Sequence, residues 1–506
     1  MGTMSALEQA VPDGFWQSDI GILPTDWKIN PLAEISVKIT DGTHDTPKPI
    51  KEGIPFLTAI HVKENHIAFE SCYFLPKSIH DEIYKRCNPE YEDILMVNIG
   101  AGTGTTALVN VKYPFSLKNV ALIKPNRKVS DGRFLNQILS FLKDQILESL
   151  SAGGAQPFLS LSQIGQINVP TPCKREQTAI ADALSDVDAL LNEIEKLIAK
   201  KQAIKTATMQ QLLTGKTRLP QFAFHPEVAD ITAQHNQALS EDSATAIATG
   251  SNSNSKTNTS ASATIIDRNN STLAANNKSL ESRRKGTKHS ELGEIPEDWE
   301  VVELSSITQK QRPISYGIVQ TGPRVNDGVR CLRVVDISNG LISKDDLITT
   351  TVEISNSYKR TQLQLNDLVI PLRGKVGEVG IIDVDLVGDN LTRGVALIAL
   401  KNGFSAKFIK QIITFENSAK RLESSMNGSA LQEVSIATLR SFKVAIPLEK
   451  EQTAISTVLS DMDEEIQALQ QRLNKTRQIK QGMMQELLTG KTRLPFEKVS
   501  ISEASV

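Results

Sequence analysis

Cysteine is scarce in this chain, and its placement excludes two classes of protein. The sequence has four cysteines, Cys72, Cys87, Cys173 and Cys331, and no two of them form a CxxC pair. This spacing fits neither a disulfide-stapled secreted domain nor a zinc knuckle. We expect reduced, buried thiols.

Long apolar runs and a leader are also lacking. No stretch approaches the roughly 18 apolar residues that a membrane-spanning helix needs. The first residues, MGTMSALEQAVPDGFW, have neither the basic start nor the apolar core of an export signal. These absences predict a soluble, cytoplasmic protein.

An excess of charge of either sign is missing as well. The 56 lysines and arginines nearly balance 58 aspartates and glutamates, which leaves a formal net charge of -2. Any basic surface for nucleic acid must therefore be local, and overall charge neither supports nor excludes such a partner. At 506 residues the chain is too long for one ordinary core and should hold several domains.

What the chain does have is an internal repeat. Residues 176–220, which begin EQTAI and end LLTGKTRLP, recur as residues 451–495 without a gap and with about half of the positions identical. GILPTDWKINPL from Gly21 likewise resembles GEIPEDWEVVEL from Gly293. The two halves therefore begin and end alike.

Between these framing pieces the halves diverge and keep only fragments such as VALI, at Val120 and Val395. A stretch rich in Ser, Asn and Thr, including ATGSNSNSKTNTSASAT, separates them and is predicted to be a flexible tether. The predicted segments are globular domains at residues 1–173 and 290–448, helices at 174–220 and 449–495, a linker at 221–289 and a tail at 496–506.

Each predicted helix carries a narrow apolar stripe in alternating steps of four and three, the a/d pattern of a coiled coil. The seam positions are Ile180, Leu184, Val187, Leu191, Ile194 and Ile198 in the first helix, and Ile455, Leu459, Met462, Ile466, Leu469 and Leu473 in the second. Further along, the stripe shifts phase and resumes at Ile204 and Ile479. The shared phase predicts an antiparallel coiled coil with pseudo-two-fold symmetry. The alternative is that each helix packs only against its own globular domain.

Both globular regions combine short β-leaning runs with a helical segment. The first has GIPFLTAIHV, EDILMVNI, TTALV and NVALI, then a helix near FLNQILSFLKDQILESL. The second repeats this order with GVRCLRVVDI, NDLVIPL, VGIIDV and GVALIAL, then a helix near AKFIKQIITFENSAKRLE. We predict the α+β class, with a mostly antiparallel, curled sheet in each domain.

The ordered motifs resemble the specificity subunits of type I restriction-modification systems across nearly the whole chain. TDGTHDTP at residues 40–47, followed by GIPFLTA, resembles the opening of one type of target-recognition domain. ISYGIVQTG at residues 314–322, followed by LRVVDI and LTRGVALI, resembles another. The EQTAI helix start and LLTGKTRLP helix end match the family's repeated regions, whereas the long tether departs from its pattern.

This resemblance implies a DNA-reading subunit without catalysis. The divergence of the two domains predicts an asymmetric, bipartite target with an unread spacer, whose length the paired helices set. The implied partners are two methyltransferase subunits, which bind S-adenosylmethionine and modify adenine, and two restriction subunits, which use ATP and Mg. This chain itself would hold no cofactor and no metal. The docking candidates at the helix ends are Leu212, Leu213, Gly215, Arg218, Leu487, Leu488, Gly490 and Arg493.

Two other functions remain as alternatives. DILMVNIGAGTG at residues 93–104 has the GxGxG pattern of an S-adenosylmethionine loop and would indicate a methyltransferase. Its counterpart, NDLVIPLRGKVGEVG, lacks that pattern, and the chain has no (D/N)PP(Y/F) motif, so we interpret both segments as turns. The second alternative is a coiled-coil scaffold for protein assembly that binds no DNA.

TGKT, at residues 214–217 and 489–492, resembles the end of a nucleotide-binding P-loop. A P-loop opens a helix, whereas these segments end one, and Gln210 and Gln485 stand where its first glycine belongs. Gly215 and Gly490 are predicted helix C-caps. Without HExxH or a PD…ExK cluster, neither a metal site nor a nuclease is predicted.

The candidates for DNA contact are loop residues whose side chains can read base edges or bind phosphates. They are His44, Lys48, Lys51, Lys63, Asn98, Thr103 and Thr105 in the first domain, and Tyr316, Gln320, Arg324, Arg330, Arg333, Arg373, Lys375 and Arg393 in the second.

Overall fold

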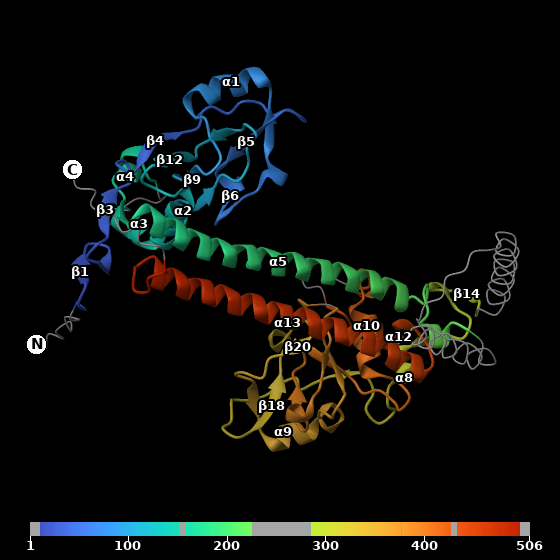
Figure 1. The fold of residues 1–506 in the computed structure, drawn as a ribbon. Helices are drawn as coiled ribbons and strands as arrows, with labels where there is room; N and C mark the ends of the chain where they lie inside the picture. The colour runs from blue at the N-terminus through green and yellow to red at the C-terminus, as the bar shows by residue number, and fades with distance from the viewer. Residues whose placement is uncertain (1–10, 151–157, 225–284, 376, 427–432, 496–506) are drawn as a thin grey trace, which may run out of the picture. The chain divides into compact units, whose positions relative to one another are not determined.

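The computed structural model describes residues 11–150, 158–224, 285–375, 377–426 and 433–495. It divides into two compact units, unit 1 with residues 1–198 and 469–506, and unit 2 with residues 199–468. Each unit holds one globular domain and a segment of each long helix, α5 (Lys174–Leu212) and α13 (Glu449–Leu487) (Figure 1). Each helix is therefore divided between the two units, whereas the predicted boundaries treat each helix as a separate segment.

The domain of unit 1 is built on an antiparallel four-stranded sheet. Its order is β10 (Thr106–Leu108), β9 (Ile94–Met96), β12 (Ala121–Pro125) and β4 (Ser36–Asp41). A second sheet has the order β11 (Ser116–Lys118), β5 (Ile54–Thr58) and β8 (Tyr73–Leu75), with β11 parallel to β5. Helices α2 (Gly132–Phe141) and α3 (Lys143–Leu150) follow the sheets in the chain.

Unit 2 repeats this topology strand for strand. Its four-stranded sheet has the order β23 (Gly380–Ile381), β22 (Leu368–Pro371), β25 (Val395–Ile398) and β17 (Ser315–Tyr316). Its three-stranded sheet has the order β24 (Asn390–Leu391), β18 (Val329–Leu332) and β21 (Ile348–Thr350), with β24 parallel to β18. Helices α10 (Ala406–Thr414) and α11 (Glu416–Ser424) follow. The predicted α+β class and internal repeat are confirmed.

Further helices and strands complete each unit. In unit 1 they are β1 (Phe15–Ser18), β2 (Gly21–Pro24), β3 (Lys28–Pro31), β6 (Val62–Lys63), β7 (His66–Ile67), α1 (Lys77–Arg86), α4 (Leu161–Gly165) and β13 (Asn168–Thr171). In unit 2 they are β14 (Thr287–Ser290), β15 (Gly293–Pro296), β16 (Glu300–Glu303), α8 (Leu304–Ile307), β19 (Ile337–Ser338), β20 (Leu341–Ile342), α9 (Val352–Ser357), α12 (Ile436–Ser441) and β26 (Lys443–Ile446).

Within unit 1 the segments of α5 and α13 pack antiparallel. Buried Ile194 and Ile198 pack with Leu473, and half-buried Leu191 and Leu469 lie beside them. Nearer the domain, Ile180 and Leu184 enter its core together with Leu487 and Leu488. Residue numbers rise along one helix as they fall along the other, so the antiparallel pairing predicted from the seam is confirmed here.

Unit 2 repeats this packing. Ile455 and Leu459 enter the core of its domain with Leu212 and Leu213, and Met462 packs against that core. The first part of each helix thus packs on its own domain as well as on the other helix. The alternative that each helix packs only against its own domain is therefore wrong.

The predicted return of the seam at Ile204 and Ile479 is wrong, because these side chains are 42% and 49% exposed. Ion pairs join the helices instead. Lys480 lies 2.6 Å from Asp188 in unit 1, and Lys205 lies 2.5 Å from Asp463 in unit 2. These two pairs occupy equivalent positions of the repeat.

Each of these aspartates also binds its own domain. Gln137 of α2 donates a hydrogen bond to Asp188 at 2.8 Å, and Gln411 of α10 donates to Asp463 at 3.3 Å. One carboxylate per unit therefore joins the globular domain to both helices.

A second repeated contact closes each unit at the helix end. In unit 1 the indole of Trp27 donates to Glu176 at 3.2 Å, and Arg493 binds both Glu176, at 2.8 Å, and Asp26, at 2.9 Å. We call this arrangement the Trp-Glu-Arg lock of unit 1. Its members come from the three repeated motifs, PTDW, EQTAI and TGKTRLP.

Unit 2 has the same lock. Trp299 donates to Glu451 at 3.3 Å, and Arg218 binds Glu451 at 2.6 Å and Asp298 at 2.8 Å. Burial alone would raise the pKa of Asp298, but hydrogen bonds from Arg218 and Lys285 outweigh this effect and hold that pKa at about 2.

Each long helix ends a few residues before the arginine that it contributes to a lock. The helices stop at Leu212 and Leu487, not at the predicted residues 220 and 495, and a glycine with φ of +69° follows each end. A Cβ atom at Gly215 would lie 2.3 Å from Pro296, and one at Gly490 would lie 2.4 Å from Pro24. The C-cap prediction is confirmed, and glycine is needed both for its backbone conformation and for this close approach.

Most of the predicted tether, residues 225–284, lies outside the described residues. Its predicted end at residue 289 is wrong, because unit 2 already includes Lys285, which lies 2.8 Å from Asp298. Strand β14 then pairs with β15. The chain therefore binds the lock of unit 2 at Lys285, before the first apolar residues of the domain.

We predict that Arg218→Ala lowers the free energy of unfolding by about 3–5 kcal/mol, because it leaves the carboxylate of Glu451 buried without its cation. The side chains of Arg218 and Glu451 are only 9% and 2% exposed. Urea unfolding of the full chain, followed by circular dichroism, measures the change. The matched control is Arg324→Ala, which removes an ion pair with 64% and 73% exposed side chains and should cost at most about 1 kcal/mol. Equal losses in the two variants would contradict the buried lock.

Candidate nucleic-acid interface

Four loops of unit 2 meet at one end of its sheets. Backbone hydrogen bonds join them: the Arg393 amide donates to Ile318 at 2.8 Å and the Thr392 amide to Leu332 at 3.0 Å. The Leu372 amide donates to Gly394 at 2.9 Å. We call residues 316–320, 333–335, 373–375 and 392–394 the loop face of unit 2.

Four of the predicted DNA-contacting residues project freely from this face. Tyr316, Gln320, Arg373 and Arg393 are exposed, and within the described residues their side chains form no hydrogen bond or ion pair. Arg373 lies across Gly394, where a Cβ atom would be 3.7 Å from its Nε. Two unpaired guanidinium groups on one surface suit phosphate or guanine contacts.

The other candidates of this domain have partners inside it. Arg333 lies 2.8 Å from Asp336, and this hydrogen bond raises the pKa of Arg333. Arg330 lies 2.8 Å from Asp389, and Lys375 donates to the carbonyl of Ile337 at 2.8 Å. Arg324 pairs with Asp346 at 3.0 Å on the surface. These four residues hold loops in place, so any base contact would have to compete with those bonds.

Unit 1 has a loop face of the same construction. The Thr43 amide donates to Leu117 at 2.9 Å, and the Asn119 amide donates to Thr43 at 3.2 Å. The corresponding donors in unit 2 are Ile318 and Arg393. The loop face of unit 1 therefore comprises residues 41–44, 58–60, 98–100 and 117–119.

Only part of the predicted set in unit 1 is available on its surface. His44 belongs to the loop face, is 63% exposed in its side chain, and hydrogen-bonds Asn119 at 2.9 Å. Lys48, Lys51 and Lys63 are exposed and unpaired among the described residues, but they lie outside the residues that define this face.

The prediction that Asn98, Thr103 and Thr105 contact DNA is wrong as regards their side chains, which are buried. Thr103 donates to the Gly100 carbonyl at 2.7 Å, and Thr105 accepts from Lys143 at 3.0 Å. The glycine-rich segment folds back between β9 and β10, and this turn draws the small polar side chains inward.

That turn also decides the interpretation of the GxGxG motif. Gly100 and Gly104 have φ angles of +97° and +84°, and the next element is the antiparallel strand β10 rather than a helix. Gly374 and Gly377 form the matching turn in unit 2, with φ angles of +72° and +87°. The glycine-rich loop of a cofactor-binding βα unit leads from a strand into a helix, whereas both segments here lead into an antiparallel strand, so their interpretation as turns is confirmed.

The candidate docking residues at the helix ends are engaged within the chain. Leu212, Leu213, Leu487 and Leu488 are buried in the domain cores. The two glycines touch prolines of the opening motifs, and both arginines are bound in the locks. The prediction that the leucine side chains form a docking surface is therefore wrong, because packing of the helix ends consumes them.

Sequence reasoning missed three residues of unit 1's loop face, Asn119, Ile99 and Ile60. The VALI repeat carried the signal for Asn119, because the residue before that motif corresponds to Arg393 once the one-residue insertion at Gly394 is allowed for. Ile99 corresponds to Arg373, because each follows a residue whose carbonyl accepts from a later backbone amide. The carbonyl of Asn98 accepts from Leu159, and that of Leu372 accepts from Val434. No pattern in the sequence marks Ile60.

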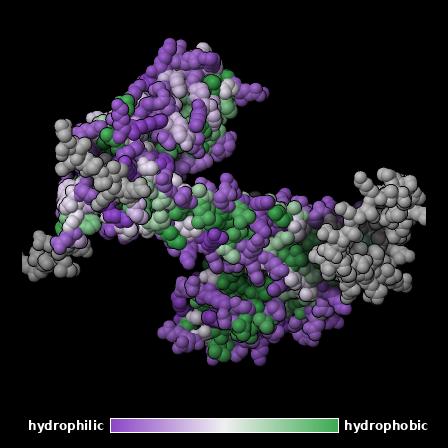
Figure 2. All heavy atoms as spheres, viewed as in Figure 1, coloured by the Kyte–Doolittle hydropathy of each residue, from purple (hydrophilic) through white to green (hydrophobic). Residues whose placement is uncertain are grey.

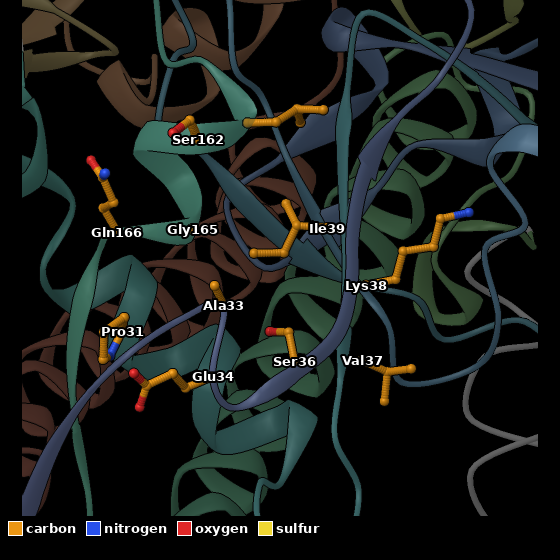
Figure 3. Close-up of a pocket in the computed structure, with 11 residues that line it drawn as sticks. Pro31, Ala33, Glu34, Ser36, Val37, Lys38, Ile39, Ser162, Gly165 and Gln166 are labelled. Atoms are coloured by element: carbon orange, nitrogen blue, oxygen red, sulfur yellow. The ribbon is translucent and has the colours of Figure 1, made fainter.

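The cavity of about 440 Å³ in Figure 3 lies elsewhere in unit 1. Residues of the β3–β4 connection, the first four residues of β4, and residues of α4 with the following Gln166 line it, and Ala33 and Ile39 face Gly165. Strand β4 runs from this cavity to the loop face, so the two sites are at opposite ends of one strand. The cavity is not part of the interface.

Comparison with known proteins decides the family. The model of the type I restriction modification DNA specificity domain matches residues 24–206 and 296–478. The chain belongs to this family. As a family member it is the DNA-recognition subunit of a restriction-modification system, and such specificity subunits have no catalytic centre.

Individual relatives agree with this assignment. The MjaVIII specificity subunit of Methanocaldococcus jannaschii is 24% identical over 482 residues, covering 93% of this chain and 94% of its own. The EcoBI specificity subunit of Escherichia coli is 38% identical over 105 residues, which span only 22% of that protein. The S subunit from M. genitalium has the same fold, with a TM-score of 0.50 at 14% identity over 91% of this chain and 96% of that one.

Among the residues that the structure describes, no helix could cross a membrane.

We predict that Arg373→Ala weakens binding of the target duplex by about 1–3 kcal/mol if its fork reads a base. The loss should disappear on a duplex already mutated at the base pair that Arg373 reads. Equilibrium binding of the chain with its methyltransferase partner to a panel of singly substituted duplexes measures this. Lys420→Ala is the control, because Lys420 pairs with Glu416 on the exposed side of α11. An equal loss on every duplex would indicate a phosphate contact instead.

Proposed function

We propose that this specificity subunit reads an asymmetric DNA target of two half-sites, one per unit, separated by an unread spacer. The observation that supports it is the contrast between the identical loop-face framework and the different side chains that it carries. Ile99 stands where unit 2 has Arg373, and Asn119 stands where it has Arg393. An arginine fork favours guanine, whereas amide and apolar side chains favour adenine and the thymine methyl group, so the half-sites should differ.

Spacer length would follow from the two helices. Both α5 and α13 have 39 residues, or about 58 Å at 1.5 Å per residue. Since each helix contributes to both units, its length would limit the separation of the loop faces. The asymmetric target and the fixed spacer are thus parts of one proposal.

The subunit would direct its partners to this target. We propose two methyltransferase subunits that bind S-adenosylmethionine and modify adenine, together with restriction subunits that use ATP and Mg, all in the cytoplasm. This chain would itself bind no cofactor. Its own part would be to recognise DNA and to hold the enzymes beside it.

A docking surface is available on the exposed side of α5 in unit 1. Leu190 and Leu197 are 41% and 40% exposed, and Figure 2 shows hydrophobic side chains at the surface of this helix. The equivalent positions of α13 are the polar residues Glu465 and Arg472. Leucines seven residues apart suit an amphipathic helix of a partner.

The test of the proposed function is a matched shortening of both helices. Deletion of residues 196–202 and 471–477 removes one heptad at equivalent positions and preserves the seam phase. Each helix loses about 10 Å, which corresponds to about three base pairs. We expect a shorter spacer and unchanged half-sites when modified bases are sequenced in a host that also expresses the partner genes. A heptad insertion at the same positions should lengthen the spacer. Active variants with the original spacer would contradict the proposal.

We predict that the double variant Leu190→Gln, Leu197→Gln weakens binding of the methyltransferase subunit at least about tenfold, because burial of each leucine contributes about 1.5–3 kcal/mol. Titration of the purified subunits, monitored by fluorescence anisotropy, measures the affinity. Arg472→Gln on α13 is the control and should leave it unchanged. If the control weakens binding as much as the leucine variant, the partner does not dock on this surface of α5.

A further inference from the structure

Both loop faces contain the same short 3-10 turn. In unit 1 it comprises residues Ala59–His61, and in unit 2 residues Val334–Asp336. In each turn the last side chain accepts a hydrogen bond from the backbone amide before the turn, His61 from Thr58 at 2.9 Å and Asp336 from Arg333 at 2.7 Å. Different side chains therefore build one geometry.

The turns are held on both sides. The preceding strands β5 and β18 pair with β11 and β24, and the hairpins β6–β7 and β19–β20 follow directly. His61 and Asp336 are 1% and 5% exposed. The middle residue of each turn thus has a fixed position on the loop face.

That middle residue is an exposed aliphatic side chain in both units. Ile60 is 62% exposed and Val335 is 66% exposed. In unit 2 the neighbouring Val334 packs against Gly394, where a Cβ atom would lie 2.9 Å from its side chain, so this turn adjoins the Arg373 and Arg393 loops. Figure 2 shows hydrophobic residues over this part of unit 2, around β18 and β20.

Two equivalent pairs, Gly42 with Gly317 and Gly100 with Gly374, keep glycine for backbone reasons, whereas the side chains compared at other equivalent positions differ in chemistry. Asp41 is equivalent to Tyr316, because the two residues have the same register in their sheets. Ile99 is equivalent to Arg373, and Asn119 to Arg393, by their backbone hydrogen bonds. Only the middle residue of the turn keeps its β-branched aliphatic character. A side chain retained while its neighbours change suits an element that both half-sites share.

We infer that Ile60 and Val335 each contact the 5-methyl group of a thymine, and that this thymine has the equivalent position in each half-site. The thymine methyl is the apolar feature that the major groove offers to an aliphatic side chain. A rigid turn positions such a contact without loss of backbone entropy. This inference rests on the proposed reading of two half-sites and assigns both of them one A·T pair in common.

The experiment is a cycle of protein and base changes on the full chain with its methyltransferase partner. The probe is the target duplex, defined by sequencing modified bases, in which each thymine of one half-site is replaced in turn by deoxyuridine. One replacement in the half-site read by unit 2 should weaken binding by wild-type protein about fourfold, because about 0.8 kcal/mol is lost with one methyl group. Val335→Ala should bind the thymine and deoxyuridine duplexes equally.

Each unit provides the matched control for the other. Val335→Ala should leave the deoxyuridine effect in the other half-site intact, and Ile60→Ala should abolish it only there. Val384→Ala removes an aliphatic side chain that is 75% exposed outside the loop face and should change neither.

Three results would overturn the inference. They are a deoxyuridine effect that persists in Val335→Ala, an equal loss of affinity on all duplexes including unrelated ones, and half-sites without an A·T pair at a common offset. If instead the wild-type complex shows no sequence preference, the proposed function itself fails. The two failures are therefore distinct.

Discussion

The structure depends on two buried carboxylates, Glu176 and Glu451, at the starts of the long helices. Each accepts hydrogen bonds from a tryptophan of its own domain's opening motif and from an arginine beyond the end of the other helix. A buried carboxylate is costly unless it is paired and fully hydrogen-bonded. This cost forces three segments that are far apart in the sequence to meet at one point, and it does so twice.

This constraint explains which parts of the two halves are alike. The opening PxxW, the EQTAI start and the TGKTRLP end each supply a member of the lock, so a change in any of them leaves a charge or an indole without its partner. The loop faces are under no such constraint, because their framework is made by backbone hydrogen bonds such as those of Thr43 and Ile318. Side chains there can vary without disturbing the fold, which suits a surface that must recognise different sequences.

The fold class, the repeat and the antiparallel pairing could be predicted from the sequence, since periodicity and repeated motifs report directly on packing. The seam failed at Ile204 and Ile479, because a heptad pattern does not show that Lys205 and Lys480 make the inter-helix contact there. The candidate site was predicted only in part. Residue type correctly indicated that arginines such as Arg393 are exposed. It could not show that the side chains of Thr103 and Thr105 are buried, because that depends on the turn between the paired strands β9 and β10. Ile60 was missed because an isolated aliphatic residue has no local signature.

The carboxylates of Asp188 and Asp463 have a mechanical consequence for reading DNA. Each accepts from a glutamine of its own globular domain and from a lysine of the opposite helix, so any swivel of the domain about its helix segment would break the glutamine's hydrogen bond to a carboxylate that the lysine holds in place. That penalty makes each domain and its helix segment a single torsionally stiff body. A protein that must present its loops to a groove at a fixed azimuth gains from such stiffness, since thermal rotation would otherwise blur the register between protein and base pairs.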